Sequence, residues 1–284
     1  MSHWPDGLRK IAGMNRRPPR TGQHAGLFFQ LFAPPDATGL PLVLLPGLLA
    51  DGRQLARLSR LLSRQVCVVD PLGSGRSEAP DAPSEYAFPA QSERLSVLLD
   101  ELGLPVVDLA GFSMGGMWAQ HALVRHPQRF RHAALVATTA ATSPRLRCIV
   151  QGLLAAHQAG VSQLDLSRTL QVMCFSADFL DPPSIIPMME ALWQGQPHAP
   201  AAVQGQLGSL LGHDLRAQLP TLQQVRAVIA GSEDFLMPPL TQKRLVELLP
   251  HAQLQLLPSA GHAVWVECPG TLATALRHAL PVCL

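Results

Sequence analysis

One serine of this chain lies where a protein could make it a nucleophile. Ser113 is the centre of Gly111-Phe112-Ser113-Met114-Gly115, which follows a mostly apolar run at residues 106–110 and precedes a helical pattern. A Gly-x-Ser-x-Gly segment between a strand and a helix is typical of a sharp turn that exposes the serine hydroxyl. Its glycines let the strand and the helix approach closely. The alternative is an ordinary strand-to-helix loop, and the rest of the chain must decide between the two.

A serine hydroxyl is a weak nucleophile at neutral pH and needs a base that accepts its proton. The chain has eleven histidines, and one of them, His262, lies in a turn at residues 258–262, just after the last apolar run. Others have structural explanations, since His126 precedes a proline and His278 lies in a terminal helical pattern. We therefore expect His262 to be the base.

A carboxylate must hold that base in the correct orientation. The apolar run at residues 225–230 is followed by a turn that contains Glu233 and Asp234 side by side. Either carboxylate could orient His262, so the residues alone leave both open. In each case the chain order would be nucleophile, acid, base.

Short apolar runs bounded by turn residues must position these side chains. They alternate with amphipathic helical patterns and cover residues 27–32, 42–45, 66–69, 106–110, 133–136, 225–230 and 253–257. Continuous apolar strands that alternate with helices predict an α/β fold with a mostly parallel central sheet and helices on both faces. Because parallel strands end at the same edge of a sheet, we expect the serine, the acid and the histidine to meet there.

The alternation stops between residues 143 and 219, where helical patches and prolines replace strands. We expect this segment to be a helical cap, or lid, inserted into a core formed by residues 26–142 and 220–284. Residues 1–25 are predicted to be a loose N-terminal lead-in. Most apolar residues of the cap are expected to pack on the core, and some to line a substrate cleft.

The composition excludes several classes of protein. The chain has 284 residues, of which 47% are hydrophobic and 15% charged, as expected for one large globular domain with an insertion. A formal charge of +2 is too small to predict binding to nucleic acid or to a membrane surface. The polar N-terminus and the absence of a long apolar run predict neither a signal peptide nor a membrane span. Five scattered cysteines predict reduced thiols in a cytoplasmic protein.

Two further patterns are expected to be structural. Residues 70–77 contain Gly-x-Gly but lack the lysine of a P-loop and the Rossmann spacing, which predicts a tight turn and no cofactor. Asp51 and Asp70 are expected to be turn or capping residues. No His, Cys, Asp or Glu residues have the spacing of metal ligands, so we expect no metal.

Motifs in a fixed order resemble those of the α/β-hydrolase superfamily over roughly residues 26–280. They are Pro46-Gly47-Leu48-Leu49, Asp70-Pro71-Leu72-Gly73-Ser74-Gly75-Arg76-Ser77, the Ser113 segment, Gly231-Ser232-Glu233-Asp234 through Pro238, and Gly261-His262 with Glu267-Cys268-Pro269. The resemblance implies that Asp234 rather than Glu233 orients His262. It also implies an oxyanion hole made by the backbone N–H groups of Leu48 and Met114. Pro46 stands where many relatives have histidine, a change that leaves these backbone donors in place.

The resemblance implies a serine hydrolase that acts on a small molecule by two-step acyl transfer. The chain is similar to the capped esterases, enol-lactone hydrolases, cofactor-free haloperoxidases and C–C bond hydrolases of that superfamily. The expected substrate is an ester, thioester or lactone of a small-to-medium, largely apolar acyl compound. The alternatives are a C–C bond hydrolase or acyltransferase with the same triad, and a ligand-binding receptor with vestigial turnover. Epoxide hydrolases and haloalkane dehalogenases would need an aspartate in place of Ser113.

Overall fold

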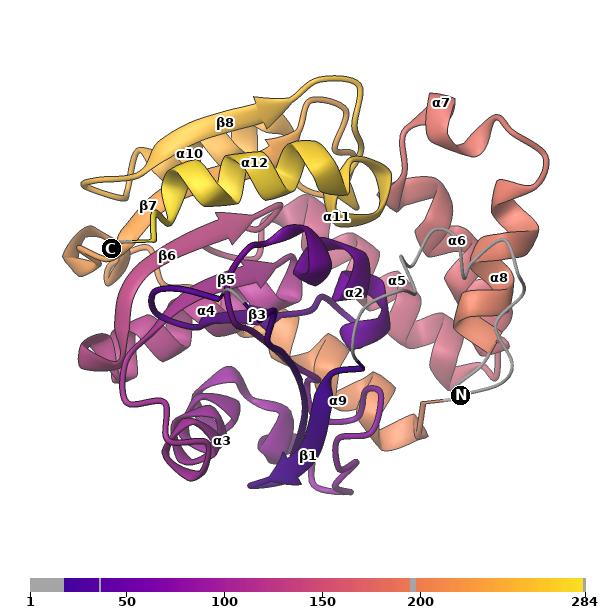
Figure 1. Ribbon diagram of the computed structural model, residues 1–284. Coiled ribbons are helices and arrows are strands. Elements are labelled where there is room, and N and C mark those ends of the chain that lie inside the picture. Colours follow the sequence, from indigo (N-terminus) through magenta and orange to yellow (C-terminus); the bar gives the residue numbers. More distant parts are fainter. Residues whose placement is uncertain (1–17, 36, 195–197, 283–284) are drawn as a thin grey trace.

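The computed structural model describes residues 18–35, 37–194 and 198–282, and Figure 1 shows how their elements are arranged. The centre is an eight-stranded sheet with the strand order β1-β2-β4-β3-β5-β6-β7-β8. The pairs β1–β2 and β2–β4 are antiparallel, whereas the pairs from β4 to β8 are parallel. The strands are β1 (Arg20–His24), β2 (Leu27–Phe32), β3 (Leu42–Leu45), β4 (Val66–Val69), β5 (Val107–Phe112), β6 (Phe130–Val136), β7 (Val225–Gly231) and β8 (Gln253–Leu257).

Each apolar run predicted to be a strand is a strand, which confirms the mostly parallel sheet. Every residue of β3, β4 and β5 is buried, because helices cover both faces of a parallel sheet and leave no face for polar side chains. In β3, Val43 and Leu45 pack into the core on one face, while Leu42 and Leu44 pack into the core on the other.

Strand β1 differs from the prediction. Residues 20–24 were expected to belong to a loose lead-in, but they pair with β2 in an antiparallel hairpin. The turn between them has positive φ angles at Ala25 (50°) and Gly26 (78°), the conformation that joins hairpin strands tightly. The strand lacks an apolar run because it is largely exposed at the edge of the sheet. Residues 1–17 of the expected lead-in lie outside the described residues.

Helices cover the sheet in two layers, as Figure 1 shows. Leu95, Met117 and Leu245 of α3, α4 and α10 pack into the core on one face. Leu55 and Leu272 of α2 and α12 pack into the core on the other face, together with α11. The bounds are α2 (Gly52–Leu61), α3 (Phe88–Glu101), α4 (Met114–Arg125), α10 (Pro239–Val246), α11 (Val264–Glu267) and α12 (Pro269–Ala279), with 3-10 turns at Pro83–Tyr86, Pro127–Arg129 and Leu219–Thr221.

Helices α5 to α9 lie between β6 and β7, and we call them the helical insertion. They are α5 (Pro144–Gln158), α6 (Gln163–Cys174), α7 (Ala177–Leu180), α8 (Ile185–Gln194) and α9 (Pro200–Leu211). The hydroxyls of Ser143, Ser162 and Ser176 accept backbone N–H bonds at the first turns of α5, α6 and α7. These serines are N-caps, which explains why each helix begins where it does. Residues 195–197 of the expected cap lie outside the described residues.

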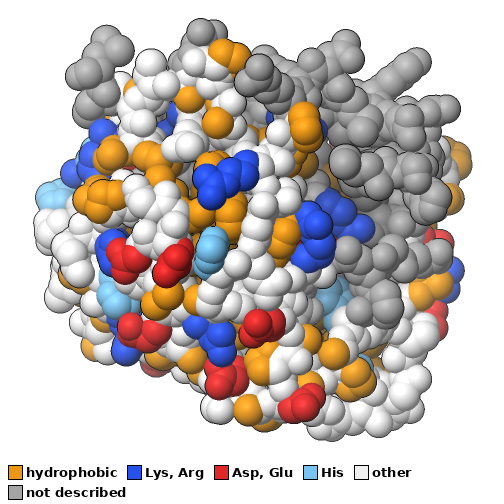
Figure 2. Space-filling view, turned by 60° about the horizontal axis from the view of Figure 1, so that its bottom comes forward, with side chains coloured by type: hydrophobic (Ala, Val, Ile, Leu, Met, Phe, Trp, Pro, Cys, Tyr) orange, Lys and Arg blue, Asp and Glu red, His pale blue; other side chains and the backbone are white. Residues whose placement is uncertain are grey.

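The surface and the cysteines agree with the composition. On the face in Figure 2, acidic and basic side chains are interspersed and no patch of one sign dominates. Cys67, Cys148, Cys174 and Cys268 are free thiols, and Cys283 lies outside the described residues. No helix in the described ranges is both long enough and apolar enough to cross a membrane.

A pair of histidines joins the end of the insertion to the core. His213 follows α9, and its Nδ1 lies 3.3 Å from Nε2 of His121 on α4. Nε2 of His213 lies 2.9 Å from the Thr139 carbonyl oxygen, and the Phe88 ring packs on both imidazoles. The pKa of each histidine is lowered from 6.5 to about 4, mainly by burial. His213 and Arg125 contribute to the lowering at His121, whereas the Thr139 hydrogen bond and Asp214 oppose it at His213. Both imidazoles are therefore neutral in the folded protein at neutral pH.

This pair predicts a loss of stability in mild acid. The unfolded chain binds protons at these histidines below about pH 6.5, but the folded protein does so only near pH 4. The unfolded state therefore binds more protons in this window, and the free energy of unfolding falls as the pH drops through it. His121→Gln should flatten this dependence in urea unfolding curves recorded between pH 4.5 and 7.5. The exposed His278 provides the control, His278→Gln. A slope in His121→Gln equal to that of the unsubstituted protein would contradict the assignment.

Candidate active site

Ser113 lies at the junction of β5 and α4 in a strained backbone conformation. Its φ is 53° and its ψ is −118°, a combination that costs a residue with a side chain about 1–3 kcal/mol. Several hydrogen bonds hold it: the Ser113 N–H donates to the Val136 carbonyl (2.9 Å), and its own carbonyl accepts from Thr138 Oγ1 (2.8 Å) and from the Gly116 N–H (2.9 Å). The surrounding structure thus fixes a turn that isolated residues would avoid.

The glycines on both sides of Ser113 permit this turn. A Cβ at Gly115 would lie 2.0 Å from the Leu45 carbonyl oxygen, and a Cβ at Gly111 would lie 2.3 Å from the Gly115 carbonyl oxygen. Neither position has room for a side chain, so α4 can approach β5 at Gly111 and the end of β3 at Gly115 only because both residues are glycine. The structure confirms the close approach of strand and helix that the motif predicts.

Asp234 and His262 form a buried pair at the same edge of the sheet. Asp234 follows β7, His262 follows β8, and Oδ2 of the aspartate lies 2.8 Å from Nδ1 of the histidine. Their side chains are 0% and 3% exposed. Asp234 Oδ1 accepts a further hydrogen bond from the Met237 N–H at 2.7 Å. With Nδ1 donating to the carboxylate, Nε2 of His262 remains available to a second group.

The neighbouring Glu233 does not take part in this pair. It is exposed, and its backbone N–H donates to the Ala260 carbonyl at 2.9 Å. Of the two carboxylates that the sequence leaves open, the structure brings Asp234 to the histidine. Burial distinguishes these adjacent acids.

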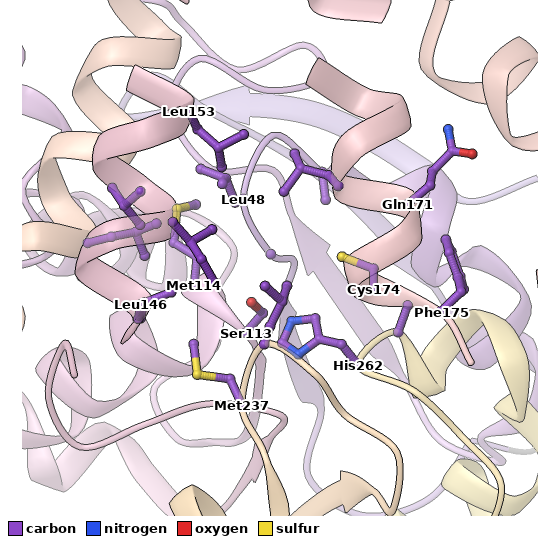
Figure 3. A pocket seen from close by; sticks show the side chains of 18 of the residues that line it. Leu48, Ser113, Met114, Leu146, Leu153, Gln171, Cys174, Phe175, Met237 and His262 are labelled. Atoms are coloured by element: carbon purple, nitrogen blue, oxygen red, sulfur yellow. The ribbon is translucent and has the colours of Figure 1, made fainter. Parts of the chain in front are cut away.

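Ser113 and His262 line one pocket. In Figure 3 the Ser113 side chain lies beside the His262 imidazole. The structure therefore brings together Ser113, His262 and, through His262, Asp234, each from the carboxyl end of a different strand. Such a set contains a hydroxyl, an imidazole that could accept its proton and a carboxylate that orients the imidazole.

The predicted oxyanion donors also lie at this pocket, and both Leu48 and Met114 line it. Met114 is the first residue of α4. Its N–H is therefore one of the first-turn amides, which have no partner within the helix and lie at the positive end of the helix dipole. The loop that carries Leu48 runs close to the serine: a Cβ on Gly47 would lie 3.3 Å from Ser113 Cβ. Both residues therefore line the same pocket as the serine.

The pocket is mostly apolar. Its described lining includes no Asp, Glu, Lys or Arg, and its polar members besides Ser113 and His262 are glutamine and cysteine side chains. The insertion supplies much of the wall. The side chains from α5 and α6 are Leu146, Ile149, Val150, Leu153, Leu170, Gln171 and Cys174. Such a lining suits an apolar compound and gives no counter-charge to an ionic one.

Cys174 and Glu267 are site residues for which the sequence predicted no role. Cys174 points toward Ser113 and His262 in Figure 3, and burial raises the pKa of its thiol to about 12, so it is neutral at ordinary pH. Oε1 of Glu267 accepts from the Gly261 N–H (3.0 Å) and Oε2 from Ser176 Oγ (2.6 Å). Glu267 thereby ties the turn before His262 to the insertion. The motif Glu267-Cys268-Pro269 marked Glu267 as part of the family resemblance, but nothing in the sequence indicated its contact with Ser176.

Two aspartates near the site are structural, as predicted. Asp51 is the N-cap of α2 and accepts from the Arg53 N–H at 2.8 Å. Oδ1 of Asp70 accepts from the Gly52 N–H at 2.7 Å. Burial, together with the charge of Asp51, raises the pKa of Asp70 to about 7. Within the described ranges, no group of three or more His, Cys, Asp or Glu side chains is placed to hold a metal ion.

Comparisons with known proteins agree with this architecture. A family model described as "alpha/beta hydrolase fold" matches residues 41–267. The pimeloyl-[acyl-carrier protein] methyl ester esterase of Chromobacterium violaceum is 29% identical over 266 residues, which cover 88% of this chain and 98% of that protein. The 2-hydroxymuconate semialdehyde hydrolase of Pseudomonas sp. strain CF600 is 28% identical over 243 residues, or 82% and 83% of the two chains.

A solved structure has the same fold. The enol-lactonase from Burkholderia xenovorans LB400 superposes with a TM-score of 0.81 at 21% sequence identity, over 92% of this chain and 99% of that chain. At this level of identity the likeness shows the fold.

The strained backbone at Ser113 predicts an unusual order of stabilities. Ser113→Gly should have a free energy of unfolding about 1–2 kcal/mol higher than Ser113→Ala, because glycine adopts a positive φ at little cost and alanine keeps the strain. Urea unfolding of both variants measures the difference. The control pair is Ser209→Gly and Ser209→Ala within α9, where a helix should reverse the order. Equal stabilities at position 113 would show that the backbone there is not strained.

Proposed function

This chain belongs to the α/β hydrolase fold family, and from that premise we propose that it is a serine hydrolase acting on an ester, thioester or lactone. The proposed substrate is a small-to-medium, largely apolar acyl compound. The observation that carries the proposal is the buried contact of 2.8 Å between Asp234 and His262, beside Ser113 in an apolar pocket.

The proposed reaction has two steps. Ser113 Oγ attacks the carbonyl carbon while His262 Nε2 accepts its proton, and His262 then gives that proton to the leaving group. Water next attacks the acyl-enzyme, with His262 as the base, and releases the acid and free Ser113. Asp234 holds the imidazole and stabilises its positive charge. The N–H groups of Leu48 and Met114 stabilise the oxyanion, each by about 3 kcal/mol.

We further propose that residues 143–219 are a cap over a core of residues 26–142 and 220–284. Support comes from α5 and α6, whose apolar side chains line the pocket that contains Ser113. In this arrangement the sheet edge provides the chemistry, and the cap provides the surface that binds the acyl group. Differences between caps would then change the substrate without changing the mechanism.

A C–C bond hydrolase is the second candidate. The relative named 2-hydroxymuconate semialdehyde hydrolase, which is 28% identical, favours it. The same serine, histidine and aspartate would be used, so the site geometry does not separate the two. Turnover of simple esters would distinguish them.

The triad assignment predicts a covalent adduct. Intact-mass analysis after treatment with a fluorophosphonate should show one adduct on the unsubstituted protein and none on Ser113→Ala. His262→Ala should lose several orders of magnitude in kcat with a p-nitrophenyl ester. Asp234→Asn should also lose activity, while the matched variant Glu233→Gln should retain it.

Each departure from this pattern has a separate meaning. An adduct without turnover of any ester would favour the C–C bond hydrolase. Labelling that persists in Ser113→Ala would show that another residue is the nucleophile. Loss of activity in Glu233→Gln but not in Asp234→Asn would exchange the roles of the two acids.

The wall of the pocket predicts a limit on acyl chain length. In Figure 3 Leu153 of α5 lies beyond Leu48 from Ser113, and it is buried. Leu153→Trp should fill the far part of the pocket and lower kcat/KM for long p-nitrophenyl esters by about tenfold or more, while acetate turnover changes little. The exposed Ala155 on the same helix gives the control, Ala155→Trp. Equal losses for short and long esters would show that the acyl chain does not lie along α5.

A further inference from the structure

Gln206 of α9 joins the helical insertion to two loops at the edge of the sheet. Its side chain is 0% exposed. Oε1 accepts from the Leu49 N–H at 2.8 Å, while Nε2 donates to the Leu72 carbonyl at 2.6 Å and to Ser74 Oγ at 3.0 Å. The amide therefore uses its acceptor and both of its donors. Leu49 belongs to the loop after β3, whereas Leu72 and Ser74 belong to the loop after β4.

The backbone that Gln206 holds has an unfavourable conformation. The Ala50 N–H donates to the Gly47 carbonyl at 3.2 Å, which closes a four-residue turn with Leu48 and Leu49 at its centre. Leu49 has a φ of 51°, a value that this position of a turn normally gives to glycine. The hydrogen bond to Gln206 fixes the Leu49 N–H in this conformation. Without it, the turn could relax to a negative φ at Leu49.

This turn carries the N–H of Leu48, the donor next to Ser113. We propose that Gln206 is a positioning residue: it holds the turn so that the Leu48 N–H points at the oxyanion in the transition state. The inference rests on the proposed serine hydrolase mechanism. It gives the insertion a second role, since α9 then sets the geometry of the reaction while α5 and α6 shape the pocket. Gln206 itself is absent from the described pocket lining, so its effect on the reaction is indirect, through the turn that carries Leu48.

Gln91 of α3 is a matched control for a merely structural role. It is also buried, at 1% exposed. Oε1 of Gln91 accepts from the Leu72 N–H at 3.1 Å, and Nε2 donates to the Tyr86 carbonyl at 2.8 Å. Gln91→Leu thus removes a buried amide from the same Leu72 loop without touching Leu49.

The test compares Gln206→Leu with Gln91→Leu in the full chain. With a p-nitrophenyl ester, Gln206→Leu should lower kcat by about 10- to 100-fold, somewhat less than the loss of a whole oxyanion donor, and leave KM within about twofold. Gln91→Leu should keep kcat within about threefold even where its stability falls as much.

A pair of inhibitors separates the oxyanion from general binding. A trifluoromethyl ketone adds to the serine and forms an oxyanion, whereas the matching alkane chain does not. In Gln206→Leu, affinity for the ketone should fall by about the same factor as kcat/KM, and affinity for the alkane should stay within about twofold. If Gln206→Leu does not fold, Gln206→Met, which also lacks hydrogen-bonding groups, replaces it with the same expectations.

Two outcomes would overturn the proposal. One is an unchanged kcat in the folded variant, and the other is an equal loss of affinity for the ketone and the alkane, which would indicate a disturbed pocket. Failure of the proposed function looks different, because the unsubstituted protein would then turn over no ester, whether or not it forms a fluorophosphonate adduct.

Discussion

The strained turn at Ser113 is the constraint on which the rest of the site depends. Ser113 has a positive φ, and the close approach of α4 to β5 and to the end of β3 requires glycine at positions 111 and 115, where a Cβ would lie 2.0–2.3 Å from a carbonyl oxygen. The turn presents the hydroxyl beyond the end of a central strand and places the first amides of α4 beside it. Partners for that hydroxyl must then come from neighbouring strand ends, and β7 and β8 provide Asp234 and His262 at 2.8 Å.

The helical insertion is bonded to the loops of the site as well as packed over them. The Ala263 N–H, next to His262, donates to the Cys174 carbonyl at the end of α6 (2.8 Å), and Glu267 joins the same region to Ser176. On the other side, Gln206 of α9 bonds to Leu49. The insertion therefore contacts the histidine loop and the loop of the proposed oxyanion hole. Changes in its helices would alter the pocket and also be transmitted to both loops.

Much of the fold could be predicted from local residue patterns. The strands at residues 42–45 and 66–69 coincide with the apolar runs, because a sheet covered on both faces demands such runs. Strand β1 escaped prediction because an exposed edge strand carries polar residues. The choice of Asp234 over Glu233 needed the resemblance, since only burial distinguishes adjacent acids in a turn. Gln206 gave no local signal: its bond to Leu49 spans 157 residues, a distance that sequence periodicity does not reach.

The apolar lining of the pocket determines how the proposed enzyme could select its substrate, whereas Ser113, His262 and Asp234 would carry out the reaction. The described lining has no Asp, Glu, Lys or Arg, and His262 is the one lining side chain that can become charged by accepting a proton. A substrate would therefore gain binding energy there mainly by burying apolar surface. A single methylene is worth about 1–3 kcal/mol in such a pocket, which limits how sharply shape alone can select one acyl group. A buried polar partner would discriminate more strongly, and Gln171 is the candidate with both amide atoms unpaired. Its amide points away from Ser113 in Figure 3, so any such discrimination would act on the part of the substrate far from the reacting carbonyl.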